Sequence, residues 1–156
     1  QLKRRYDLIP NLVETAKAYM AHERETLEAV INARNDAAAI LKAMGNGNLS
    51  TVELGKLASA EGTLSGALGK LNVTMEAYPD LKANENMMQV SEELITTENR
   101  VAFARQGFND AVMAYNSYRQ SFPPVVLAGK FGHPEDASLL NFDDSAQIQA
   151  APQVTF

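Results

Sequence analysis

The fold is decided by residues 84–122, which read NENMMQVSEELITTENRVAFARQGFNDAVMAYNSYRQSF. Large apolar side chains return at every seventh position of this stretch: Met87, Leu94, Val101, Phe108, Tyr115 and Phe122. A seven-residue repeat keeps these side chains on one face of an α-helix, which can then pack lengthwise against other helices. Pro123-Pro124 interrupts the pattern, because proline lacks the amide hydrogen that continues a helix. We therefore predict one long helix from near Asn84 to near Phe122.

Two further helical patterns precede this stretch. The first covers about residues 2–44, with apolar positions three and four apart, and Pro10 should kink it or mark the first turn of its main part. Residues 45–48 (GNGN) break the pattern, and Ser50 with Glu53 forms a capping box at the start of the next helix. That second helix carries an apolar seven-residue repeat and ends at residues 78–80 (YPD).

The short connections between these patterns favour antiparallel neighbours. We predict an all-α fold, an antiparallel up-and-down helical bundle of three long helices, with a short fourth C-terminal helix within residues 125–130. Residues 1–132 would form the bundle, and residues 133–156 a surface tail that packs on it or trails from it. No stretch alternates strictly enough to predict a strand.

The composition excludes several classes of protein. The 156 residues are 46% hydrophobic and 21% charged, as expected of one globular domain. The net charge of −5 provides no basic excess for binding nucleic acid. The absence of cysteine excludes thiol catalysis and thiolate metal sites. No run of eighteen apolar residues is present, so this stretch should not itself span a membrane.

Several segments resemble the LemA family, and they occur in the family's order along nearly the whole chain. They are residues 4–13 (RRYDLIPNLV), 60–61 (AE), 78–84 (YPDLKAN), 97–101 (TENRV), 104–105 (AR), 115–116 (YN) and 121–124 (SFPP). The resemblance implies a bacterial helical-bundle protein of the cell envelope, anchored by one transmembrane segment that precedes residue 1. We expect the helical region to be extracytoplasmic, although neither the sequence nor the resemblance names the side of the membrane. The family offers no catalytic residues to transfer, and neither a catalytic residue nor a cofactor is predicted.

Charged residues interrupt the apolar stripes of all three predicted helices. Arg34 lies on the first stripe, Glu61 on the second, and Glu98 and Arg105 on a flank of the third. Folding the chain at its breaks places them at about the same height, where two positive and two negative charges would balance. We predict a buried polar layer that fixes the register of the helices. A carboxylate site for a metal or a proton is the alternative, but no Glu-x-x-His pair supplies metal ligands.

Small residues form a continuous stripe on the predicted second helix: Gly55, Ser59, Gly62, Gly66 and Gly69. Glycines spaced four apart allow another helix to approach closely. The stripe is a candidate docking face for a partner helix or a second copy. A thin solvated face, or close packing against the chain's own short fourth segment, explains the same pattern.

These observations favour a non-enzymatic, membrane-tethered interaction or scaffold module that binds envelope or membrane proteins or itself. The alternative is a small-ligand or ion sensor in which the buried charged layer receives the ligand. Nucleic-acid binding is not expected.

Overall fold

The computed structural model describes residues 1–140 except 46, 48–49, 122 and 133–134, and it does not describe residues 141–156. Its helices are α1 (Leu2–Lys17), α2 (Arg24–Met44), α3 (Thr51–Met75), α4 (Pro79–Lys82), α5 (Glu85–Gln120) and α6 (Pro124–Ala128). The part of the chain that the structure describes contains no strand, so the predicted all-α class is confirmed. The heptad position at Phe122 and most of the predicted tail lie outside the described residues.

The predicted single helix over residues 2–44 is wrong, because the chain reverses between Lys17 and Arg24. Pro10 lies inside α1 without ending it. The reversal contains neither glycine nor proline, and contacts from distant parts of the chain hold it instead. Tyr78 donates a hydrogen bond to Glu23 at 3.2 Å, and Asn84 donates one to the hydroxyl of Tyr19 at 3.0 Å. The described chain therefore has four long helices where three were expected.

Capping side chains fix the starts of α3 and α5. The Ser50 hydroxyl accepts from the amide of Glu53 at 3.2 Å, so the predicted cap is confirmed. Asn84 accepts from the amide of Met87 at 3.0 Å in the same way. Each bond satisfies one of the amides that a helix start leaves without an intrahelical partner. The predicted short C-terminal helix is present as α6.

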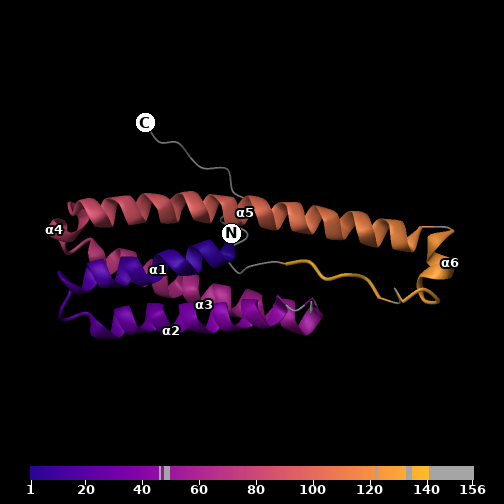
Figure 1. Cartoon of the computed structure of the whole chain (residues 1–156), viewed down its shortest axis with the longest axis horizontal. Helices are drawn as coiled ribbons and strands as arrows, with labels where there is room; N and C mark the ends of the chain where they lie inside the picture. The colour runs from indigo at the N-terminus through magenta and orange to yellow at the C-terminus, as the bar shows by residue number, and fades with distance from the viewer. Residues whose placement is uncertain (46, 48–49, 122, 133–134, 141–156) are drawn as a thin grey trace.

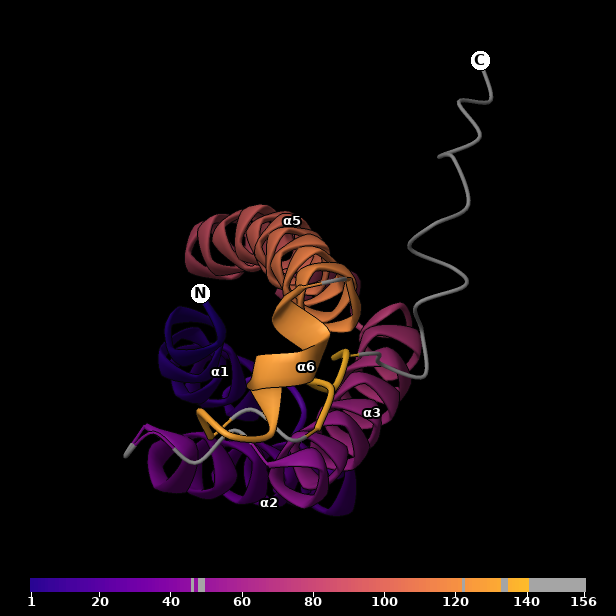
Figure 2. The ribbon, with the colours of Figure 1, turned by 90° about the vertical axis from the view of Figure 1, so that its right-hand side faces the viewer.

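The four long helices lie side by side around a main apolar core, and a second, smaller apolar cluster adjoins it (Figures 1 and 2). Viewed along the molecule, α5 lies beside α1, α1 beside α2, and α2 beside α3 (Figure 2). The reversal after α1 and the short helix α4 share one end of the molecule (Figure 1). From that end α5 runs well beyond α2 and α3, and α6 closes its far end (Figure 1).

No helix in the described residues combines the length and the apolar character needed to cross a bilayer. The longest one, α5, carries charged residues on several of its turns.

Leucine side chains of α3 should contribute most of the packing energy at the centre of the bundle. Leu71 is fully buried, whereas Val73 on the same helix is exposed. We expect Leu71→Ala to lower the free energy of unfolding by about 2–5 kcal/mol, because it removes buried methyl groups and leaves a cavity. Val73→Ala should change it by less than about 0.5 kcal/mol. Urea unfolding of both variants checks this, and equal effects would contradict the central position of Leu71.

Candidate functional site

Arg5 is the centre of a charged cluster that joins three helices. It is buried on α1, and its guanidinium forms an ion pair with Glu61 of α3. Its Nε atom lies 2.8 Å from Oε1 of Glu98 on α5. Nη2 donates to the hydroxyl of Ser65, also on α3, at 3.3 Å. One side chain therefore ties α1 to both α3 and α5.

Tyr6 completes the coordination of Glu61. Its hydroxyl donates a hydrogen bond to Oε1 of the Glu61 carboxylate, while Arg5 pairs with Oε2. Burial raises the pKa of Tyr6 well above its ordinary value, and the hydrogen bond to Glu61 raises it further. Both effects favour the protonated phenol, which is the form that can donate to a carboxylate.

Arg34 supports the cluster from α2 without entering it. Its Nε atom donates to the backbone carbonyl of Tyr6 at 2.9 Å. Its Nη2 atom lies 4.0 Å from the exposed carboxylate of Asp7. Residues 5–7 of α1 thus contact every other long helix of the bundle.

The residues of the predicted charged layer therefore occupy different positions around Arg5. Glu61 and Glu98 share Arg5 as a partner, Glu61 with 1% of its side chain exposed and Glu98 with 40%. Arg34 reaches the backbone next to Arg5. Arg105 is buried on α5 about 10.5 Å along the helix from Glu98. That these four residues act together as a structural layer stays a prediction.

Arg5 and Tyr6 were not predicted as members of the layer. If residues 2–44 formed one helix, Tyr6 and Arg34 would lie about 42 Å apart along it. The reversal between α1 and α2 brings them into hydrogen-bond contact instead. The available signal was the RRYD segment, in which a charged and an aromatic residue precede the apolar stripe that begins at Ile9.

The arrangement of the cluster suits a structural role. A buried charge costs several kcal/mol unless it is paired and hydrogen-bonded, and here both Glu61 oxygens have donors. Among the described residues, no group of three His, Cys, Asp or Glu side chains is placed to hold a metal ion. Both donors to Glu61 belong to the chain itself, and Glu98 is the edge of the cluster toward solvent.

Three glycines of the small-residue stripe have no close neighbour in the part of the chain that the structure describes. Among those residues, a methyl group added at Gly55, Gly66 or Gly69 would meet no atom within 4 Å. Ser59 is exposed and Gly62 is partly exposed. Close packing against the described helices at those three glycines is therefore excluded, and docking of a partner helix on this stripe stays a prediction.

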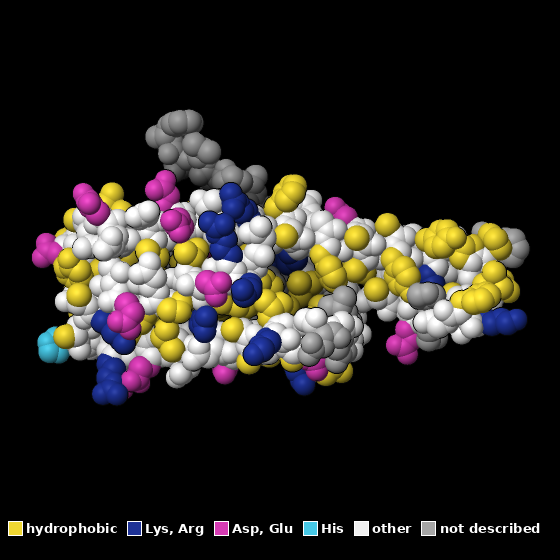
Figure 3. Space-filling model, viewed as in Figure 1, with side chains coloured by type: hydrophobic (Ala, Val, Ile, Leu, Met, Phe, Trp, Pro, Cys, Tyr) yellow, Lys and Arg dark blue, Asp and Glu magenta, His cyan; other side chains and the backbone are white. Residues whose placement is uncertain are grey.

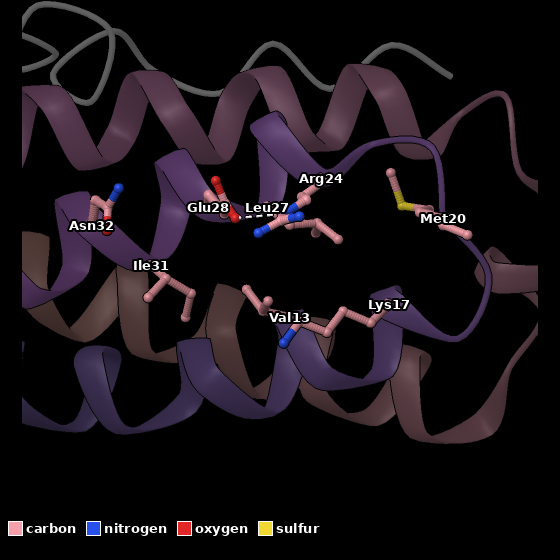
Figure 4. Close-up of a pocket in the computed structure, with 9 residues that line it drawn as sticks. Val13, Lys17, Met20, Arg24, Leu27, Glu28, Ile31 and Asn32 are labelled. Carbon is pink, nitrogen blue, oxygen red and sulfur yellow. Dashed lines mark hydrogen bonds and ion pairs between the residues drawn. The ribbon is translucent and has the colours of Figure 1, made fainter.

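An apolar groove lies between α1 and α2 near their connection (Figure 4). It encloses about 410 Å³. Charged and polar side chains stand among the apolar ones, and Arg24 pairs with Glu28 across 2.7 Å. The lining comprises Val13, Lys17, Met20, Ala21, Arg24, Leu27, Glu28, Ile31 and Asn32. Arg5, Tyr6 and Glu61 do not line it, so this groove does not lead to the charged cluster.

Removing one partner of the buried pair should be more harmful than removing both. Glu61→Leu leaves the buried Arg5 without its main partner, and we expect a loss of about 3–5 kcal/mol in the free energy of unfolding. The double variant Arg5→Met/Glu61→Leu should lose less, because no unpaired buried charge remains. Glu28→Gln, which breaks an exposed pair, is the control and should cost less than about 1 kcal/mol. A double variant less stable than Glu61→Leu would contradict this account.

The raised pKa of Tyr6 predicts a specific loss of stability in alkali. The stabilisation is fully present below the ordinary tyrosine pKa of 10.0 and is lost as pH rises above it, because the unfolded chain then releases the proton. We expect the free energy of unfolding of the native chain to fall by about 1.4 kcal/mol per pH unit, relative to that of Tyr6→Phe, between about pH 10 and pH 12. Denaturant unfolding of both proteins across this range measures the difference. If the free energies of unfolding of the two proteins depended on pH in the same way, the pKa of Tyr6 would be the same in the folded and the unfolded chain, which would contradict this prediction.

The sequence of the whole chain matches a known family. The pattern of the LemA family covers residues 1–156. Protein LemA of Metamycoplasma hominis is 25% identical over 130 residues, which are 82% of this chain and 54% of that protein. The magnetosome protein MamQ of Magnetospirillum gryphiswaldense is 30% identical over 87 residues, which are 56% of this chain and 30% of that protein.

A further relative has the same partial coverage. The magnetosome protein MamQ 2 of Paramagnetospirillum magneticum is 26% identical over 142 residues, covering 81% of this chain and 52% of that protein. The chain thus spans about half the length, or less, of the curated relatives it matches. Because the family pattern extends over every residue of the sequence, the chain belongs to the LemA family.

Proposed function

We propose that this chain is a non-enzymatic interaction module, tethered to a bacterial membrane on the extracytoplasmic side, that binds other envelope proteins through the apolar end formed by α6. The observation that carries the proposal is the exposure of large apolar side chains at that end (Figure 3). Tyr118 is 68% exposed, Val126 67% and Phe131 66%. Contiguous exposed apolar surface on a soluble domain is typical of a binding site.

The apolar end has a shape that can accept a side chain. A groove of about 430 Å³ lies where α5 meets α6. Its lining is aromatic and aliphatic apart from one arginine, and comprises Tyr115, Tyr118, Arg119, Pro123, Pro124, Leu127, Ala128 and Phe131. Arg119 is held by Asp136 at 2.8 Å, so its charge is already paired. An aromatic or aliphatic anchor from a partner protein fits this chemistry.

The position of the apolar end also supports binding to a partner. The extension of α5 places α6 beyond the tips of α2 and α3 (Figure 1). A partner could therefore approach without contacting the core of the bundle. The chain's relatives carry the names of a LemA protein and of magnetosome proteins, none of which is the name of an enzyme.

The sensor alternative requires a ligand to reach the charged cluster. Arg5, Tyr6 and Glu61 are each buried, and both carboxylate oxygens of Glu61 already have donors in Arg5 and Tyr6. A ligand would have to break these bonds before binding, which makes the interaction module the better-supported proposal. An ion that bound the folded chain would raise the melting temperature.

Site-specific photocrosslinking in the full-length, membrane-anchored protein tests the proposal. A photoreactive residue at Val126 should capture one protein, identified by mass spectrometry, and Leu127→Asp should abolish the capture by placing a charge in the contact. The same photoreactive residue at Val73, which is similarly exposed on α3, is the matched control. Capture that is the same at both positions, or that survives Leu127→Asp, would argue against the apolar end as the binding surface.

A further inference from the structure

An extended segment of the chain, residues 135–140, lies along the part of α5 that runs beyond the bundle (Figure 1). We call it the latch. It runs back from α6 toward the bundle, antiparallel to α5 (Figure 1). Its contacts with α5 include hydrogen bonds to two asparagine side chains, an ion pair between Arg119 and Asp136, and a hydrogen bond from Gln120 to Asp136.

Asn116 and Asn109 each bind the latch through both halves of the side-chain amide. Asn116 donates to the carbonyl of Ala137 at 2.9 Å and accepts from the amide of Ala137 at 2.7 Å. Asn109 donates to the carbonyl of Leu140 at 2.8 Å and accepts from the amide of Leu140 at 2.7 Å. The two side chains therefore bond to the latch as a neighbouring β-strand would.

The spacing of these bonds matches the geometry of the two segments. Asn109 and Asn116 are seven residues apart, which is about 10.5 Å along an α-helix. Ala137 and Leu140 are three residues apart, which is about 10 Å along an extended chain. A pair of asparagines at this spacing therefore binds the backbone of an extended segment. These four hydrogen bonds do not depend on which side chains the segment carries.

Side-chain contacts fix the two ends of the latch. Asp136 accepts from Nε of Arg119 at 2.8 Å at one end. Leu140 is buried at the other end, in a cluster with Met44, Leu54, Leu57 and Val101. Between them, the hydroxyls of Ser138 and Thr51 lie 2.6 Å apart, which joins the latch to α3.

We propose that the latch is exchangeable: the latch of one copy can occupy the Asn109–Asn116 site of a second copy, giving a dimer by segment exchange. The second copy is the occupant that the structure supports, because its latch is chemically identical to the one already seated. Every latch contact would be kept after exchange. The proposal is independent of the partner proposed for the apolar end.

The connection between α6 and the latch contains Gly132, whose φ of +83° in the closed form is adopted by glycine without strain and only rarely by residues with a Cβ. The balance between the closed and the exchanged form is therefore set by concentration and not by strain in the native turn. The closed form prevails at low concentration, because a short tether keeps the latch at an effective concentration on the order of 1 mM. Exchange should therefore become detectable as the chain approaches that concentration.

Single-cysteine variants of the complete chain test the exchange, since the native sequence contains no cysteine. Thr51→Cys and Ser138→Cys are prepared as separate proteins of different tag size, mixed at about 1 mM and oxidised mildly. A disulfide between the two proteins forms above the level due to random collision only when the latch of one copy is seated on the other. We expect the mixed dimer to exceed, several-fold, the dimer formed in the matched mixture of Thr51→Cys with Leu139→Cys, because Leu139 is exposed and neighbours on an extended segment face opposite sides.

Two further variants should change the amount of mixed dimer in opposite directions. Asn109→Ala/Asn116→Ala should reduce it to the level of the Leu139→Cys mixture, because the latch loses its site on either copy. Gly132→Val should increase it, because the closed turn is then strained. Leu127→Asp, which is aimed at the apolar end, should leave it unchanged.

The double variant Thr51→Cys/Ser138→Cys measures seating of the latch within one chain, and there the expected product is a monomer with an internal disulfide. An internal disulfide together with a mixed dimer no more abundant than in the Leu139→Cys mixture would overturn the exchange. Failure to form either product would overturn the seating of the latch itself.

Discussion

Burial of the Glu61 carboxylate is the constraint on which the rest of the bundle depends. Apolar seven-residue repeats allow two helices to slide by one heptad, about 10.5 Å, with little change in the character of the seam. Glu61 does not allow this, because a slip would leave its charge buried without Arg5 and Tyr6 at a cost of several kcal/mol. Arg5 also binds Glu98, and Arg34 binds the backbone at Tyr6, so contacts at one place join all four long helices, and we expect them to fix the register of the bundle.

Local sequence rules predicted the elements that local interactions determine. The caps at Ser50 and Asn84 and the prolines after Ser121 bound helices whose ends depend on nearby residues, and α3 and α5 lie close to their expected limits. The reversal between α1 and α2 has no such signal, because its residues are compatible with a continuous helix. It is held by Tyr78 and Asn84, which are more than fifty residues away in the chain. Arg5 was missed for the same reason, since its place depends on that reversal.

The extra length of α5 divides the molecule into two parts with different interactions. Along the bundle, its inner face packs through side chains such as Met87 and Val101. Beyond the bundle, no long helix of the described chain covers that face, and α6 and the latch take the place of one. Asn109 and Asn116 each follow an aromatic heptad position by one residue. In this part of α5 they form hydrogen bonds with the extended backbone of the latch. The heptad pattern alone could not show this change of partner.

The latch and the Glu61 cluster differ in what opening them would expose. A net hydrogen bond contributes about 0.5–1.5 kcal/mol, so the four bonds from Asn109 and Asn116 are together worth about 2–6 kcal/mol. Opening the latch also exposes Leu140, whose burial is worth about 1.5–3 kcal/mol. The sum is comparable with the roughly 3–5 kcal/mol expected on breaking the Glu61 pair, but opening the latch leaves no charge buried without a partner. The polar groups of the latch return to water when it opens, whereas the Glu61 cluster opens only when the helices around it separate, and exchange between folded copies requires the first of these events alone.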